Sequence, residues 1–173
     1  ATLSAEARAA VEANPANVTR ILASASPPIF HALSAVGSAL INGSTMPPNI
    51  RELAILRVGY ISNSRYETFQ HEALARFVGM SEAEIEAIKA GDAGSPALNP
   101  AQSAALEFVE DIVANVRASD RTLDAVRQHL SDAEVIDLIS VTGFYMLICR
   151  LLETTGIELD SDPIDWNTIA EQR

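Results

Sequence analysis

Three side chains able to bind or move a proton recur at helical spacing in the segment NSRYETFQH, residues 63–71. Ser64, Glu67 and His71 are three and four residues apart, so a helix places them on one face. The apolar residues Leu74 and Val78 share that face, and polar groups on an apolar face need a reason. A carboxylate one turn before an imidazole can fix its tautomer or favour the imidazolium. The pattern indicates a proton-handling site, with an incidental helix ion pair as the alternative.

A second carboxylate, Glu52, lies in the preceding apolar segment NIRELAILRVGYIS, residues 49–62. It shares a helical face with Leu56 and with Gly59, a residue that lets another backbone or a ligand approach closely. The short turn around residues 62–63 predicts that the two helices form an antiparallel hairpin. We therefore expect Glu52 and His71 to face one cleft, where Glu52, Glu67 and His71 would form a general acid–base set.

The elements that must position these residues are all helical, because prolines divide the chain into helical blocks and strand patterns are weak. Capping boxes at SEAE (residues 81–84) and SDAE (131–134) start two of the helices, and Gly91 and Gly156 end them. Asn49 is a candidate cap for the helix that carries Glu52. We predict an all-α fold with helices over residues 4–14, 17–25, 29–42, 49–62, 64–78, 82–90, 100–118, 120–130 and 131–155, followed by an acidic tail over 157–173.

The last predicted helix is apolar on most of its circumference, so nearly every side must be covered. In a chain this short, part of that cover can come from another subunit, and we expect a homo-oligomer. Phe144 and Tyr145 in this helix are expected to be core residues, and Cys149 a small buried hydrophobe. Trp166 is expected to anchor the tail in a groove or a subunit interface.

Composition excludes several classes of partner. The chain has 173 residues, 48% of them hydrophobic and 20% charged, which suits one globular domain over residues 1–173. A net charge of −11 argues against nucleic acid and against a polybasic membrane surface. No apolar stretch of ~18 residues free of charge and no signal peptide is visible, so we expect no membrane association.

The sequence contains no motif that indicates a metal or another cofactor. The single cysteine allows no internal disulfide, which fits the cytoplasm. Three scattered histidines, with no HExxH pattern and no cysteine pair, give no metal signature. We therefore expect neither a metal nor another cofactor, and a small molecule as substrate.

The segment RELAILRVGYISNSRYETFQHEALARFVGMSEAEIEAI resembles the core motif of the carboxymuconolactone decarboxylase family, which includes alkylhydroperoxidase D. The matching pieces are Glu52-Leu53, His71, the stretch from Ala75 to Gly79, and Met80-Ser81 before an acidic helix. The match covers about residues 49–90. The resemblance implies an alkylhydroperoxidase D-like helical bundle that is oligomeric, as a dimer, trimer or hexamer.

The family has two chemical branches. Its peroxidase branch carries Cys-x-x-Cys-x-x-x-His with a glutamate twelve residues before the first cysteine, which maps to Glu52, Ser64, Glu67 and His71 here. Both thiols are absent, so a dithiol peroxidase cycle is disfavoured. The decarboxylase branch carries Tyr-Glu-x-x-x-His, which Tyr66, Glu67 and His71 match. This resemblance implies a cofactor-free lyase like 4-carboxymuconolactone decarboxylase.

The roles that the resemblance suggests are proton donation by His71, orientation of His71 by Glu67, and a second relay or positioning carboxylate in Glu52. We add Arg51 or Arg57 as a bidentate partner for a substrate carboxylate, and Ser64 and Tyr66 as further substrate-binding candidates, although the helical wheel turns Tyr66 away from His71. The expected substrate is a small carboxylated lactone or a related enolisable carbonyl compound. The alternatives are a cysteine-independent hydrolase or peroxidase-like relative, and a non-catalytic ligand-binding oligomer.

Overall fold

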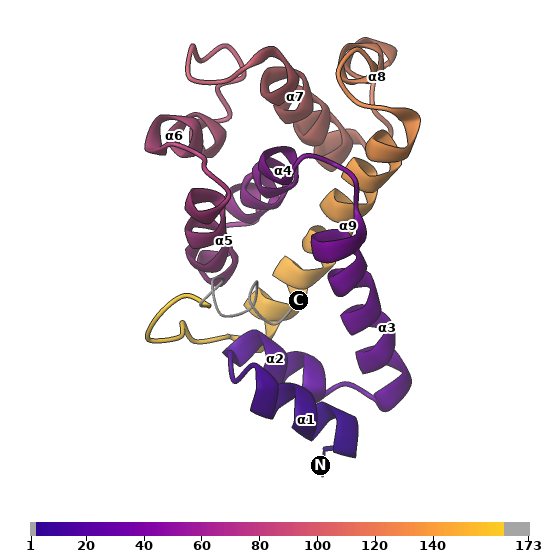
Figure 1. Ribbon diagram of the computed structural model, residues 1–173, viewed down its shortest axis with the longest axis vertical. Coiled ribbons are helices and arrows are strands. Elements are labelled where there is room, and N and C mark those ends of the chain that lie inside the picture. The colour runs from indigo at the N-terminus through magenta and orange to yellow at the C-terminus, as the bar shows by residue number, and fades with distance from the viewer. Residues whose placement is uncertain (1–2, 165–173) are drawn as a thin grey trace.

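The computed structural model describes residues 3–164, and every regular element in that range is a helix (Figure 1). This confirms the predicted all-α class. The elements are α1 (Ala5–Ala13), α2 (Asn17–Ala23), α3 (Pro27–Ser38), a π-helical turn η1 (Ala39–Gly43), α4 (Pro48–Ile61), α5 (Arg65–Phe77), α6 (Glu82–Ala90), α7 (Pro100–Asn115), α8 (Asp120–Arg127) and α9 (Asp132–Thr155).

Four of the five predicted caps are present. Ser81 and Ser131 each form a reciprocal capping box with the glutamate three residues later. Gly91 and Gly156 end α6 and α9 in the left-handed conformation, at φ 70° and 65°.

The start of α4 differs from the prediction. Asn49 is not its cap, because Pro47 occupies the N-cap position and Pro48 starts the helix. Proline suits the first helical position, since its fixed φ is already helical and its missing N–H would be unpaired there.

Helix α4 is the centre of the fold and packs against α5, α7 and α9 (Figure 1). Leu53, Ala54, Ile55 and Leu56 are fully buried, so consecutive residues, and hence all sides of this helix, are covered. Glu52 lies among them with 0% of its surface exposed. A charged group in that position needs partners, because burial of an unpaired carboxylate is strongly unfavourable.

The α4–α5 hairpin is as tight as predicted. Asn63 makes the turn with φ 52°, a conformation that asparagine tolerates better than most residues. A Cβ atom added to Gly59 would lie 3.0 Å from Cγ2 of Thr68 on α5. The absence of a side chain at Gly59 therefore lets the two helices approach closely and brings the face of Glu52 toward that of His71.

Helix α9 packs its buried face against α4 but leaves a second apolar strip uncovered. Ile136, Ile139 and Leu147 are 61%, 43% and 42% exposed, and Gly143 lies between them. By length and composition alone α9 could cross a membrane, but 44% of its most apolar window is buried within the protein. A central core helix of a globular protein has the same properties.

After α9 the chain turns back along α2 and α5, and we call residues 157–164 the strap (Figure 1). Asp160 Oδ1 in the strap accepts a hydrogen bond of 3.0 Å from the backbone N–H of Asn17, the first residue of α2. The rest of the predicted acidic tail, including Trp166, lies outside the residues that the structure describes.

Candidate active site

A chain of buried charged groups runs through the α4–α5 hairpin. The guanidinium Nε of Arg51 donates to Oε1 of Glu52 at 2.9 Å. The other carboxylate oxygen of Glu52 lies 2.7 Å from Nδ1 of His71. On the opposite edge of the imidazole, Nε2 lies 3.1 Å from Oε1 of Glu67. The helix pair therefore brings together the three predicted acid–base residues, and it holds the imidazole between two carboxylates.

These contacts determine the protonation state of His71, which is only 5% exposed. Burial by itself lowers the pKa of the imidazole. The negative charge of Glu52 and its hydrogen bond, followed by those of Glu67, outweigh burial and raise the pKa to about 9. At neutral pH His71 is therefore an imidazolium that donates one N–H to each carboxylate.

Arg51 completes the chain by compensating the charge of Glu52. Its side chain is buried, and its second hydrogen bond goes to the backbone carbonyl of Ile41 in η1 at 3.0 Å. The prediction that Arg51 holds a substrate carboxylate does not fit this geometry, because the guanidinium is used inside the protein.

Arg57 lies on another side of α4. Its guanidinium donates to the carbonyl oxygens of Ile88 and Lys89 and pairs with Glu110 of α7. Five residues along a helix is about 500°, so Arg57 points well away from the face of Glu52. Arg57 therefore does not line the cavity beside Glu67 and His71, where a residue that binds a substrate carboxylate at this site would have to lie.

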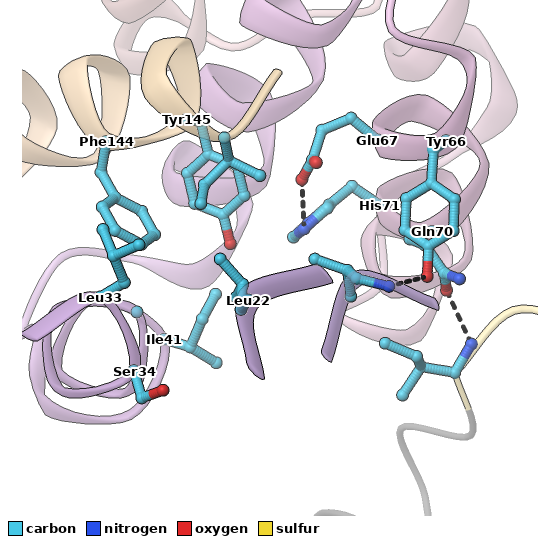
Figure 2. A pocket seen from close by; sticks show the side chains of 14 residues that line it. Leu22, Leu33, Ser34, Ile41, Tyr66, Glu67, Gln70, His71, Phe144 and Tyr145 are labelled. Atoms are coloured by element: carbon cyan, nitrogen blue, oxygen red, sulfur yellow. Dashed lines mark hydrogen bonds and ion pairs between the residues drawn. The ribbon is translucent and has the colours of Figure 1, made fainter. Parts of the chain in front are cut away.

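Next to the acid–base pair is a cavity of about 230 Å³ (Figure 2). Glu67 and His71 form one polar part of its wall, and most of the remainder is apolar. None of the described residues on the wall is a lysine or an arginine. The lining residues are Val18, Leu22, Leu33, Ser34, Gly37, Ile41, Tyr66, Glu67, Gln70, His71, Phe144, Tyr145, Ile148 and Ile164.

Tyr66 lies on the wall of this cavity, whereas the helical wheel turned it away from His71. The reason is that α2 and the strap cover the side of α5 that the helical wheel predicts to face away from His71. The Tyr66 hydroxyl donates to Oδ2 of Asp160 and accepts from the backbone N–H of Val18 at 3.2 Å. The Tyr66 hydroxyl therefore holds the strap and α2 rather than facing a ligand.

Gln70 belongs to the same strap contact. Its amide nitrogen donates to Oδ2 of Asp160 at 2.8 Å, and its amide oxygen accepts from the backbone N–H of Ile164 at 2.8 Å. Figure 2 shows Gln70 and Tyr66 side by side on this wall. The strap thus places Ile164 as part of the cavity wall.

Ser64 occupies the N-cap position of α5 and is buried, but it does not line this cavity; it lines a separate hollow beside Gly59 and Tyr60. The single cysteine, Cys149, is buried in α9 as predicted. Burial, followed by the negative charge of Glu67, raises the pKa of its thiol to about 11. Neither residue offers the thiolate that a peroxidase site requires.

Sequence reasoning missed two groups of residues. Phe144 and Tyr145 were expected in the core, and Tyr145 does belong to the main core cluster with Phe144 packed against it. Both also line the cavity, which was not expected, and the Tyr145 ring meets His71 edge to face with centroids 5.1 Å apart. Asp160 was not predicted to have any role. No sequence pattern distinguishes two aromatic residues in an apolar helix, or one aspartate in an acidic tail. The positions of these residues become clear only from the packing of α9 and the strap.

Comparisons with known proteins agree with this fold. The model of the carboxymuconolactone decarboxylase family matches residues 27–111. No curated protein matches the chain. Among solved structures, a peroxidase-related protein with an alkylhydroperoxidase D core from Ralstonia eutropha has a TM-score of 0.78 at 21% identity, covering 92% of this chain and 87% of that one.

Two further structures have the same fold. A peroxidase-related protein from a Silicibacter species has a TM-score of 0.75 at 18% identity, over 90% of this chain and 83% of that one. A variant of the debrominase Bmp8, in complex with 2,3,4-tribromopyrrole, has a TM-score of 0.71 at 13% identity, over 91% and 82%. At these identities the likeness concerns the fold.

Proposed function

We propose that this chain, whose residues 27–111 match the carboxymuconolactone decarboxylase family, is a cofactor-free enzyme that transfers a proton at a carbon atom beside a carbonyl group. The observation that carries the proposal is the buried His71 imidazolium, held between two carboxylates on the wall of an apolar cavity. A buried group with a strongly raised pKa in a cavity is a typical acid–base site.

The geometry supports a division of roles between the two carboxylates. Glu52 has no exposed surface and lies behind His71, so we assign it the orientation of the ring through Nδ1. Glu67 and Nε2 share a proton on the wall of the cavity, so we assign them the transfer to or from substrate. This differs from the expectation that Glu67 orients the ring, and of the two roles expected for Glu52, relay or positioning, it keeps positioning.

In decarboxylation of a carboxylated lactone, the bond between the ring and the carboxylate would break and its electron pair would move toward the carbonyl oxygen. Carbon dioxide would leave, and the proton shared by His71 and Glu67 would be added to carbon. Simple enolisation uses the same groups, with the Glu67 carboxylate first taking the proton from carbon. Neither route needs a metal or a redox partner.

The cavity favours a small and mostly apolar substrate. His71 is the single positively charged side chain on the described part of its wall, and Glu67 is beside it. A substrate with several carboxylates would lose hydration without a matching cation. We therefore favour an enolisable carbonyl compound with at most the one carboxylate that leaves. The Bmp8 complex with tribromopyrrole gives further support for a ring-sized ligand in this fold.

The proposal is tested with five-membered lactones, neutral and carboxylated, incubated in D₂O and followed by NMR for deuterium uptake at carbon and for loss of carbon dioxide. We expect activity in the wild type and a decrease of about 10²–10⁴-fold in Glu67→Gln and in His71→Gln. Glu72→Gln is the matched control, because Glu72 is on the same helix but contacts Tyr60 and Arg76. Unchanged rates in both test variants would refute the assignment.

The same samples distinguish the alternatives. A hydrolase would release the ring-opened hydroxy acid, and a peroxidase-like relative would consume added peroxide in the presence of a thiol-blocking reagent. Binding of a lactone with neither deuterium uptake nor conversion would identify a ligand-binding protein.

We also propose that the chain assembles as a homo-oligomer through the exposed strip of α9, formed by Ile136, Ile139, Gly143 and Leu147. Large apolar side chains aligned on one helix face are typical of an interface. Assembly would cover the part of α9 that residues 3–164 leave exposed.

A further inference from the structure

Tyr145 is held against the catalytic histidine by its ring. The centroids of the two rings are 5.1 Å apart and their planes are inclined by 86°, and Phe144 supports Tyr145 in a second edge-to-face contact at 5.6 Å. The side chain is 7% exposed. Packing on both sides leaves the ring with little freedom, so the direction of its hydroxyl is fixed by the fold.

The Tyr145 hydroxyl itself has no hydrogen-bond partner between residues 3 and 164. It belongs to the wall of the cavity, and Figure 2 shows it directed toward the cavity on the same side as the His71–Glu67 pair. Buried tyrosine hydroxyls usually have a partner. Residues 3–164 supply none, and the hydroxyl is accessible from the cavity, so the geometry places it to donate a hydrogen bond to a molecule bound there.

The other tyrosine of the wall provides a contrast. The Tyr66 hydroxyl is fully used, since it donates to Asp160 and accepts from Val18. Gln70 is likewise engaged at both ends of its amide by Asp160 and Ile164. Tyr145 is therefore the neutral donor, among the buried polar residues of this wall, that remains available to a ligand.

Its protonation state suits a donor. Burial, and then the negative charges of Glu67 and Glu52, raise the pKa of the Tyr145 phenol well above its usual value of 10. The hydroxyl therefore keeps its proton at neutral pH. A neutral hydroxyl can donate a hydrogen bond to a carbonyl oxygen. It cannot neutralise the charge of a carboxylate as a cation does.

We infer that Tyr145 donates a hydrogen bond to the carbonyl oxygen of the substrate while the His71–Glu67 pair exchanges a proton at the neighbouring carbon. The inference rests on the proposed function and narrows its substrate to a compound whose carbonyl oxygen and acidic carbon lie side by side. When Glu67 takes the proton, the C–H bond breaks and its electron pair moves to the carbonyl oxygen. Tyr145 stabilises this enolate without losing its own proton, and return of the proton to carbon restores the carbonyl.

The experiment compares two probes of the same shape, cyclohexanone and methylenecyclohexane, which differ in having a C=O or a C=CH₂ group. Dissociation constants are measured by NMR titration, and the carbonyl stretching frequency of bound cyclohexanone by infrared spectroscopy. We expect Tyr145→Phe to weaken cyclohexanone binding about tenfold, which corresponds to about 1.4 kcal/mol, to leave the alkene unaffected and to raise the stretching frequency.

Tyr66→Phe is the matched control: it removes a hydroxyl from the same wall, and we expect equal effects on the two probes and no change in the carbonyl frequency. A carbonyl frequency that is the same in wild type and Tyr145→Phe, or failure of cyclohexanone to bind, would overturn the inference. These readouts do not depend on turnover. If the carbonyl frequency shifts as expected but the wild type catalyses no deuterium uptake by cyclohexanone, the hydrogen bond is established and the proposed function is contradicted.

Discussion

Replacing Glu52 with glutamine tests the central electrostatic argument, that two carboxylates keep a buried imidazole protonated. Glu52 makes the 2.7 Å contact with His71 and contributes the largest of the effects that raise its pKa. A pKa raised from 6.5 to about 9 corresponds to about 3 kcal/mol of stabilisation, at about 1.4 kcal/mol for each pH unit. Glu52→Gln keeps a hydrogen-bonding oxygen but removes the charge, so we expect the pKa of His71 to decrease from about 9 toward its ordinary value of 6.5.

The sign of the pH dependence follows from the direction of this shift. Because the folded protein binds the proton more tightly than the unfolded chain, the stabilisation is complete below pH 6.5 and is lost as the pH rises through 9. The wild-type free energy of unfolding should therefore decrease by about 3 kcal/mol over this range through His71. In Glu52→Gln that decrease should largely disappear.

The assays are NMR titration of ¹⁵N-labelled histidine and urea unfolding between pH 6 and pH 9. His71→Gln assigns the resonance. Glu72→Gln is the control for loss of a carboxylate from the same hairpin, since Glu72 contacts Tyr60 and Arg76 rather than His71. A wild-type His71 that titrates at or below pH 6.5 would refute the reasoning, because burial would then outweigh the carboxylates.

Three other substitutions test the strap, the hairpin and the surface of α9. Asp160→Ala removes the acceptor shared by Tyr66 and Gln70, so we expect a decrease of about 1–3 kcal/mol in unfolding free energy and weaker cyclohexanone binding by NMR titration; unchanged binding would show that the strap does not shape the cavity. Gly59→Ala puts a Cβ 3.0 Å from Thr68 and should cost about 1–3 kcal/mol in urea unfolding, whereas Gly43→Ala, which meets no atom within 4 Å, should cost nothing; equal effects would contradict the close approach of α4 and α5. Leu147→Asp should lower the mass measured by light scattering, and a monomeric wild type would refute assembly through α9.

Much of the site was predictable because it depends on one local hairpin. Residues 52–71 contain Gly59, the short turn, and Glu67 and His71 at helical spacing. Within this hairpin the position of each side chain follows from regular helix geometry. Caps at Ser81 and Ser131 were equally predictable, since a capping box needs only four residues. The grouping of Glu52, Glu67 and His71 could therefore be inferred without knowing the rest of the fold.

Some side-chain positions could not be predicted, because they depend on contacts between distant segments. Arg51 and Arg57 both had the chemistry to bind a carboxylate, but their real partners, Ile41 and Glu110, are set by η1 and α7. Tyr145 reaches His71 only because α9 packs against α4. Side-chain type and spacing do not contain that information.

The arrangement of the strap and α9 has a consequence for how selectivity can change. Glu52, Glu67 and His71 lie inside the region that matches the family, residues 27–111. Much of the wall comes from outside it: Val18, Leu22, Phe144, Tyr145, Ile148 and Ile164. The residues of the proposed proton-transfer unit and these cavity-wall residues thus lie on different segments of the chain. We expect exchange of α2 and the strap between relatives, with the hairpin untouched, to change which substrates bind while leaving the proposed proton-transfer residues in place.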